Sequence, residues 1–170
     1  MATIADVYRK IGELKIDGIV EDYIVGGGMA ALFYAQTALT FDIDVFVVIP
    51  REGVLIDLSP LYRWAREQGF EVRGEHLVLH SVPVQVLVAN DGLETEALRQ
   101  PRMMKSGDVD VPVMQPEYLI ASYLDVGGKE RRTRAMDLYR ADVVDYAKLK
   151  DILTRYDLME EWRNQGGREL

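Results

Sequence analysis

The stretch from Tyr23 to Ile49 constrains the fold more than any other part of this sequence. It begins with a short apolar segment, passes through three consecutive glycines and a segment expected to be helical, and ends in the apolar run 45–49. A nearly unbroken apolar run is typical of a strand that is covered on both faces of its sheet. The order of strand, glycine turn, helix and strand predicts an α/β fold.

Two carboxylates, Asp42 and Asp44, stand directly before this apolar run. Alternate residues of a strand point to the same face, so both carboxylates are expected on one side and Ile43 on the other. Burying two adjacent like charges is costly unless they are neutralised. We therefore expect the pair at the rim of the sheet, where a divalent cation can bind both carboxylates.

The glycines Gly26, Gly27 and Gly28 allow a positive φ and a close approach of the backbone to a ligand. The helix expected over residues 29–37 offers free amides at its N-terminus, which suit phosphate oxygens. A tight turn that packs the helix on the sheet, without a ligand, also explains the glycines. The carboxylates downstream favour the phosphate interpretation.

The order Gly27-Gly28, a short helix, Thr40 and then Asp42-Ile43-Asp44 resembles the signature of the nucleotidyltransferase superfamily, which has the polymerase-beta-like fold. The likeness is greatest to small bacterial members, including the nucleotidyltransferases of abortive-infection toxin–antitoxin pairs. It implies a mixed sheet flanked by helices, with a C-terminal helical segment. We expect residues 1–114 to form the nucleotidyltransferase-like domain and residues 115–170 to form helices packed on it.

The resemblance also implies an activity and a set of site residues. The activity is metal-dependent transfer of a nucleoside monophosphate from a nucleoside triphosphate (NTP) to a hydroxyl of an RNA or protein acceptor. One or two Mg²⁺ ions are the implied cofactor, and a cognate antitoxin is an implied partner. Asp42 and Asp44 are the implied magnesium ligands. Amides of Gly26–Gly28 are implied to hold the triphosphate, and Thr40 to support a phosphate or the aspartates.

Gln85 is the departure that bears most directly on activity. Residues 82–89 predict a strand, with Val84, Val86 and Val88 alternating toward the core. In the resembling fold this strand lies beside the Asp-x-Asp strand and carries a third carboxylate, whose place Gln85 takes here. An amide is a weaker ligand for a hard cation than a carboxylate, and it cannot act as a general base. The nearest other acids along the sequence are Glu75 and Asp91.

Residues 109–114 are expected to form an edge strand, because Pro112 cannot donate a hydrogen bond within the centre of a sheet. Helices are expected over residues 116–126, from Lys129 to about 144, and over 145–155 and 158–163. The resemblance matches Arg134 and Asp137 to an Arg-x-Lys-Asp motif near the nucleotide. The residues usual in relatives are replaced by Ala38, Tyr123 and Met136. Two interpretations remain open: an active nucleotidyltransferase, and a catalytically degenerate nucleotide-binding or protein-interaction module of the same fold.

The charged residues divide unevenly along the chain. The net charge of −8 argues against broad, nonspecific binding of nucleic acid. Basic residues are dense only between Lys129 and Arg140, where they either face a triphosphate or an RNA end or form a solvated helix face paired with acids.

The remaining composition excludes several classes. The chain has no cysteine, so it has neither disulfides nor a thiolate metal site, and its two histidines, His76 and His80, are interpreted as strand residues. No apolar run approaches about 20 residues, and the N-terminus lacks the layout of a signal peptide. We therefore expect a cytoplasmic protein without a membrane partner.

Overall fold

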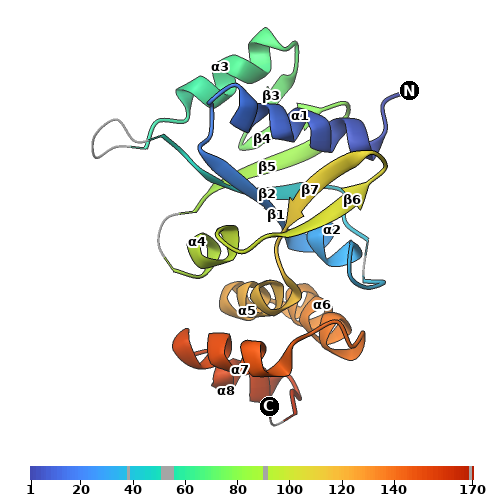
Figure 1. The fold of residues 1–170 in the computed structure, drawn as a ribbon, viewed down its shortest axis with the longest axis vertical. Helices are drawn as coiled ribbons and strands as arrows, with labels where there is room; N and C mark the ends of the chain where they lie inside the picture. Colours follow the sequence, from blue (N-terminus) through green and yellow to red (C-terminus); the bar gives the residue numbers. More distant parts are fainter. Residues whose placement is uncertain (38, 51–55, 90–91, 169) are drawn as a thin grey trace.

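The structure, a computed structural model, describes residues 1–37, 39–50, 56–89, 92–168 and 170. Its strands form one mixed sheet in the order β3-β4-β5-β2-β1-β7-β6 (Figure 1). The strands are β1 (Asp22–Gly26), β2 (Ile43–Val48), β3 (Glu71–Arg73), β4 (His76–Leu79), β5 (Val82–Val88), β6 (Arg102–Ser106) and β7 (Val109–Val113). The α/β class and the mixed sheet expected from the sequence are confirmed.

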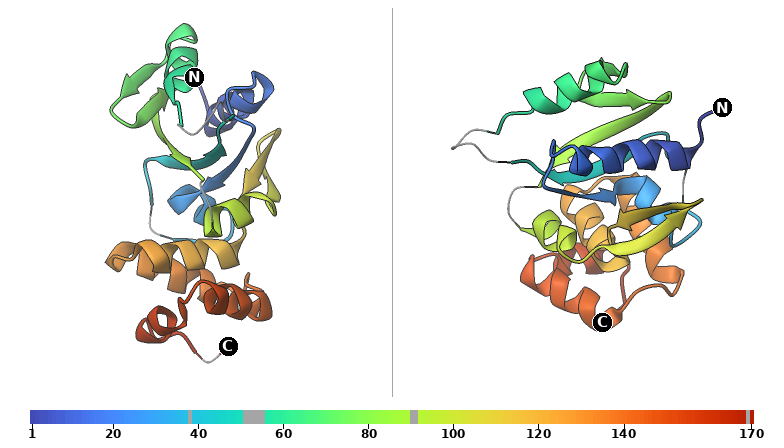
Figure 2. Two further views of the ribbon diagram at one scale, coloured as in Figure 1. Left: turned by 90° about the vertical axis from the view of Figure 1, so that its left-hand side faces the viewer. Right: turned by 45° about the horizontal axis from the view of Figure 1, so that its top comes forward.

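Helices cover both faces of this sheet. They are α1 (Ile4–Ile16), α2 (Gly27–Leu32), α3 (Ser59–Glu67), α4 (Leu93–Leu98), α5 (Pro116–Val126), α6 (Lys129–Arg140), α7 (Tyr146–Arg155) and α8 (Met159–Asn164). In Figure 1, α1 and α3 lie above the sheet, whereas α2 and α4 lie below it. The helices α5–α8 form further layers below α2 and α4, as the turned views of Figure 2 also show.

The centre of the sheet is its most deeply buried part. β2 pairs antiparallel with β1 and parallel with β5. On the face of β2 opposite the carboxylates, Ile43, Val45 and Val47 are fully buried, while the residues between them are half-buried. This alternation fixes the register of β2, because a slip of one residue would move the apolar set out of the core.

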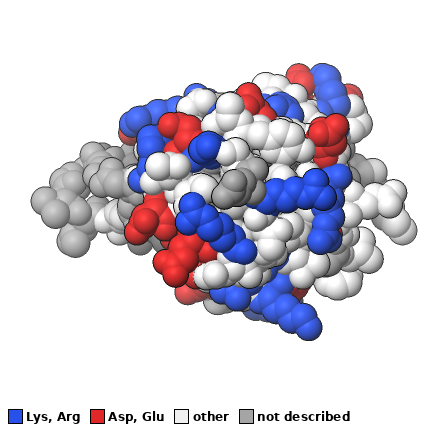
Figure 3. Space-filling view, turned by 90° about the horizontal axis from the view of Figure 1, so that it is seen from below, with Lys and Arg blue, Asp and Glu red and all other residues white. Residues whose placement is uncertain are grey.

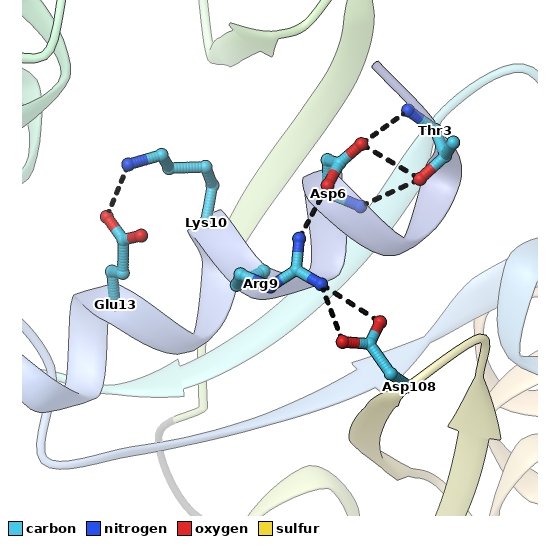
Figure 4. Close-up of polar contacts among 6 residues, drawn as sticks. All are labelled: Thr3, Asp6, Arg9, Lys10, Glu13 and Asp108. Atoms are coloured by element: carbon cyan, nitrogen blue, oxygen red, sulfur yellow. Dashed lines mark hydrogen bonds and ion pairs between the residues drawn. The ribbon is translucent and has the colours of Figure 1, made fainter. Parts of the chain in front are cut away.

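The helix α1 is tied at its start to the hairpin formed by β6 and β7. Thr3 and Asp6 form a capping box, in which each side chain accepts a hydrogen bond from the other residue's backbone N–H. Arg9 then pairs with Asp6 and reaches Asp108 in the hairpin turn, at 3.0 Å (Figure 4). Because these side chains are largely exposed, the ion pairs contribute little to the free energy of unfolding and serve mainly to position α1.

Three expectations about secondary structure are wrong. The helix after the glycines begins earlier and is shorter than expected, since α2 ends at Leu32. Beyond it, the ring of Phe33 packs on Tyr8 of α1, with ring centroids 5.9 Å apart, a tertiary contact of the kind that can override helix propensity. The helix from Lys129 ends at Arg140, before the expected residue 144.

The third error concerns the strand that contains Pro112. Its proline predicts an edge strand, but β7 lies between β1 and β6, and β6 is the edge. The ladder between β7 and β1 is short, with Val113 opposite Val25. Pro112 lies opposite Met103 of β6, outside that short ladder, so its missing N–H breaks no bond to β1.

Of the helices within the described ranges, none is both long and apolar enough to span a membrane. The expected boundary between residues 114 and 115 stays a prediction.

Candidate functional site

A row of directly paired residues crosses five strands of the sheet at the position of Asp44. Gly26 of β1 lies opposite Asp44, which lies opposite Gln85 of β5. Gln85 in turn lies opposite His76 of β4, and His76 lies opposite Arg73 of β3. Directly paired residues of neighbouring strands project to the same face. The row therefore places a carboxylate, an amide, an imidazole and a guanidinium side by side.

Asp42 and Asp44 share this face, as the sequence predicts. β2 begins at Ile43, so Asp42 lies one residue before the strand, and both carboxylates are half-buried. Thr40 donates its hydroxyl to Asp42 Oδ1 over 2.6 Å. Neither aspartate forms an ion pair with any side chain that the structure describes. Their charges are therefore left for a cation to neutralise.

The environment of Asp44 opposes its ionised form. Burial raises the pKa of Asp44, and the neighbouring charge of Asp42 raises it further. Arg131, Arg134 and His76 act in the opposite direction, which shows that all three lie near this carboxylate. A carboxylate in this situation gains from a bound cation more than an exposed one does.

Gly27 packs directly against Asp44. A Cβ atom built on Gly27 would lie 1.8 Å from Asp44 Oδ2, and the backbone of Gly27 is left-handed, with a φ of 59°. Both facts require glycine here. Tyr123 of α5 donates its hydroxyl to the carbonyl oxygen of Gly27 over 2.6 Å. Burial raises the pKa of Tyr123, so the phenol stays protonated and remains a donor.

Gly28 and Gly26 are also constrained by close neighbours. A Cβ atom on Gly28 would lie 2.9 Å from Thr40 and 3.2 Å from the guanidinium carbon of Arg134. A Cβ atom on Gly26 would meet the ring of Phe46, at 2.5 Å. The glycine turn thus brings the start of α2 against Thr40, Asp44 and α6.

Arg134 is a buried cation with spare hydrogen-bonding capacity. Only 8% of its surface is exposed. Its Nη2 donates to Glu130 over 2.8 Å and to the carbonyl oxygen of Leu39 at 3.5 Å. Its Nε is buried without a partner among the described residues. A buried donor of this kind is costly unless an anion or water accepts from it.

Gln85 occupies the position expected for it. Its register opposite Asp44 is confirmed, while Val84 on the other face is fully buried beside Ile43. Its Nε2 reaches Glu75 Oε2 at 3.4 Å. Asp91, the second alternative acid, lies outside the described residues. Within the described ranges, no group of three or more acidic or histidine side chains is placed to hold a metal ion.

A pocket of about 280 Å³ opens beside Asp42, over β4 and β5. Its apolar wall includes Phe41, whose surface is 84% exposed. The cation in its wall, Arg73, is held by Glu71 through bonds of 3.1 and 3.0 Å. The lining residues are Phe41, Asp42, Arg73, His76, Val78 and Pro83.

The assignment of Asp137 to the site stays a prediction. Asp137 is half-buried on α6, and its carboxylate takes part in none of the hydrogen bonds or ion pairs found among the described residues. Ala38 lies outside the described residues. Conversely, Arg131 and His76 influence Asp44 although neither was assigned to the site from the sequence. Arg131 belongs to the basic run at the start of α6, whereas His76 joins the row only through strand pairing between distant segments.

Together, the mixed sheet, the glycine turn and the paired carboxylates form a nucleotidyltransferase-like fold. The nucleotidyltransferase-like protein from Paracoccidioides brasiliensis, described as antigenic, has 14% sequence identity and a TM-score of 0.55, covering 94% of this chain and 89% of that one. The antibiotic-resistance factor ANT(2'')-Ia has 15% identity and a TM-score of 0.51, covering 94% and 96%. No protein-family model matches the sequence, and no curated protein matches it. At such low identities the structural similarity establishes the fold alone.

Proposed function

We propose that this protein binds an NTP together with Mg²⁺ and transfers its nucleoside monophosphate to a hydroxyl group. The observation that carries the proposal is the pair Asp42 and Asp44, which lie on one face without an ion-pair partner among the described residues, with Asp44 packed against the Gly27 backbone. A scaffold role alone does not require two such carboxylates side by side, in a place where burial opposes the charge of Asp44.

The donor set fits a magnesium ion. Carboxylate oxygens are the protein ligands that Mg²⁺ uses most, and it binds them together with substrate phosphates. Asp42 and Asp44 are the ligands we propose, with Thr40 orienting Asp42 through the 2.6 Å hydrogen bond. When bound, the ion supplies charge neutralisation at the phosphates and activation of the attacking hydroxyl.

Cations of α6 and amides of the glycine turn are the proposed contacts to the triphosphate. Arg134 has a buried Nε that lacks a partner in the described structure, and Arg131 lies near Asp44. Because α2 spans only Gly27–Leu32, its helix dipole contributes little, so the arginines carry the attraction. Gly27 and Gly28 let the side chains of Asp44 and Arg134 pack close to this turn. Catalysis by this chain would consist mainly of positioning and electrostatic stabilisation.

The pocket beside Asp42 is the proposed position of the acceptor. It lies over β4 and β5, whereas Gly27, Gly28 and α6 lie toward β1 on the other side of Asp44. Two reactants bound on opposite sides of the carboxylates would meet at them. The largely apolar wall and the neutralised Arg73 suit an uncharged part of the acceptor.

A second candidate function is a nucleotide-binding or protein-interaction module that has lost transfer activity. Gln85 favours it, because this amide lies beside Asp44 at the position of the third carboxylate. With less negative charge, the site would hold one magnesium ion with the nucleotide and a second ion only weakly.

The resemblance to toxin–antitoxin nucleotidyltransferases adds a finer proposal. If the chain is such a toxin, its production without an antitoxin should slow bacterial growth, and production of the Asp44→Asn variant should not. Equal growth inhibition by both proteins would argue against a toxin that acts by nucleotidyl transfer.

A transfer assay separates the two candidate functions. The protein is incubated with each α-labelled NTP, Mg²⁺, and either total RNA or a soluble protein extract. Label that enters an acceptor with wild type, and not with Asp42→Asn or Asp44→Asn, supports transfer. Magnesium-dependent binding of an NTP without label transfer supports the degenerate module. Absence of both binding and transfer for all four NTPs would refute the proposal.

A further inference from the structure

The helix α6 presents cations on two opposite sides. Successive residues of an α-helix are about 100° apart, so Arg131 and Arg134 lie on one side and Lys129, Arg132 and Arg140 on the other. The first pair acts on Asp44. The basic run of this acidic chain is therefore divided between the candidate active site and a separate surface.

Two adjoining hollows lie along the second side of α6. The first, of about 320 Å³, is lined by Lys129, Arg132, Arg140 and Gln165, among others. The second, of about 440 Å³, is lined by Arg140, Tyr146 and Arg168, among others. They share Met136 and Arg140, so they form one continuous groove between α6 and the segment Gly166–Arg168.

The far wall of this groove is held firmly in place. A Cβ atom on Gly167 would meet the indole of Trp162, at 2.2 Å, so the segment packs directly on this ring. Trp162 is fully buried and donates its Nε1–H to the carbonyl oxygen of Arg168 over 2.9 Å. Its ring meets Tyr139 edge to face, with centroids 4.8 Å apart. Arg168 is thereby fixed opposite α6.

Most cations of the groove are available for a ligand. Arg132 pairs with Glu161 at 3.3 Å, but Lys129, Arg140 and Arg168 form no ion pair with any described residue. Figure 3 views the molecule from the side of α7 and α8 and shows Lys and Arg side chains spread among acidic ones over this face. The acid within the groove is Asp142, which accepts a hydrogen bond from Tyr146 over 3.3 Å.

We propose that this groove binds a single-stranded nucleic acid. Spaced cations fit successive phosphates of a strand, and an exposed aromatic ring offers a face on which a base stacks. Tyr146 is such a ring, with 42% of its surface exposed and an edge-to-face contact to Tyr139 at 5.5 Å. The acidic surface elsewhere repels the phosphates and confines the strand to the groove. Because the groove lies on the opposite side of α6 from Asp44, the proposal does not depend on transfer activity.

Fluorescence anisotropy with labelled single-stranded RNA and DNA of the same mixed sequence tests this proposal. The variant Lys129→Glu/Arg140→Glu should bind at least about tenfold more weakly than wild type. Loss of two phosphate contacts should also lower the slope of log affinity against log salt by about 1.4. The matched control is Arg63→Glu/Arg66→Glu on α3, since these residues are exposed and the change in net charge is identical.

Several outcomes would overturn the proposal. Equal weakening by the two double variants would show a net-charge effect only. Equal competition by poly-glutamate would show that the groove binds any polyanion, and no binding of either strand at low salt would exclude the site.

Arg168→Glu gives a second test on the opposite wall, and it should also weaken binding. Stronger binding of RNA than of DNA would identify a contact to the 2′-hydroxyl, and equal binding would assign recognition to the shared phosphates and bases.

Discussion

The backbone of Gly27 lies so close to the side chain of Asp44 that a Cβ atom on Gly27 would fall 1.8 Å from Asp44 Oδ2. The contact joins the glycine turn to the carboxylate strand and defines one wall of the candidate site. Tyr123 holds the same glycine from the other side, through its carbonyl oxygen, at 2.6 Å. Changes at Gly27 and Tyr123 therefore test the site without removing either proposed magnesium ligand.

Gly27→Ala should abolish magnesium-dependent NTP binding, because the new methyl group displaces the Asp44 carboxylate. The matched control is Gly74→Ala, since Gly74 has a φ of 61° and no atom within 4 Å of a built Cβ. In both variants the left-handed backbone should lower the free energy of unfolding by about 1–2 kcal/mol, measured by denaturant unfolding. Only Gly27→Ala should lose more than this and fail to bind. Normal NTP binding by Gly27→Ala would show that the contact has no bearing on the site.

Asp44→Asn should stabilise the metal-free protein at neutral pH. Burial and Asp42 raise the pKa of Asp44 in the folded state, so the ionised carboxylate is better hydrated in the unfolded chain. Stability is therefore lost as pH rises through the raised pKa, and the difference between variant and wild type should vanish below about pH 4, the ordinary pKa of aspartate.

Thermal unfolding across a pH series, without metal, measures this effect. Asp125→Asn is the control, because Asp125 is exposed and its carboxylate has no hydrogen bond or ion pair with any residue that the structure describes. A melting temperature of Asp44→Asn that stays at or below that of wild type at neutral pH contradicts the prediction. Added Mg²⁺ should raise the melting temperature of wild type and leave that of Asp44→Asn unchanged.

Tyr123→Phe should reduce the free energy of unfolding by about 0.5–1.5 kcal/mol and weaken NTP binding. The lost hydroxyl frees the Gly27 carbonyl oxygen, so the glycine turn becomes less well positioned. Tyr118→Phe is the control, because it removes the hydroxyl of another buried tyrosine away from the site, which donates to Glu96 over 2.8 Å and accepts from Gln100 over 3.0 Å. Similar losses of NTP affinity in both variants would assign the effect of Tyr123 to general stability.

Gln85→Glu should increase the affinity for Mg²⁺ on the order of tenfold, since a third carboxylate adds ligand charge beside Asp44. Without metal, the added charge near Asp44 and Glu75 should lower the melting temperature. Gln68→Glu, on the exposed end of α3, serves as the control for the change in net charge. An Mg²⁺ affinity that does not change in Gln85→Glu would show that this position does not contribute to the metal site.

Sequence periodicity predicted those parts of the site that depend on local geometry. Alternation along a strand placed Asp42 and Asp44 on one face. The same argument placed Gln85 on the face opposite to that of Val84. The positive φ of Gly27 agrees with the conformational freedom expected of glycine. These inferences need only the period of a strand and the properties of single residues.

The remaining parts depend on contacts between distant segments. His76 and Arg73 join the row beside Asp44 because β3, β4 and β5 pair in one register, which the sequence does not specify. The division of the basic residues of α6 depends on which side of the helix packs on α2, and Arg131 was therefore not assigned to the site. The packing of Phe33, directly after α2, on Tyr8 of α1 is a further contact between distant segments.

The most direct test of the central claim is calorimetric titration of wild type with a non-hydrolysable NTP analogue, in excess Mg²⁺ and in excess EDTA. If Asp42 and Asp44 hold a magnesium ion shared with the triphosphate, EDTA and Asp44→Asn should each weaken binding by at least about tenfold, or about 1.4 kcal/mol. Asp125→Asn should bind as wild type does. The same affinity with and without Mg²⁺, unchanged in Asp44→Asn, or no binding of any NTP analogue by wild type, would contradict the assignment of this site.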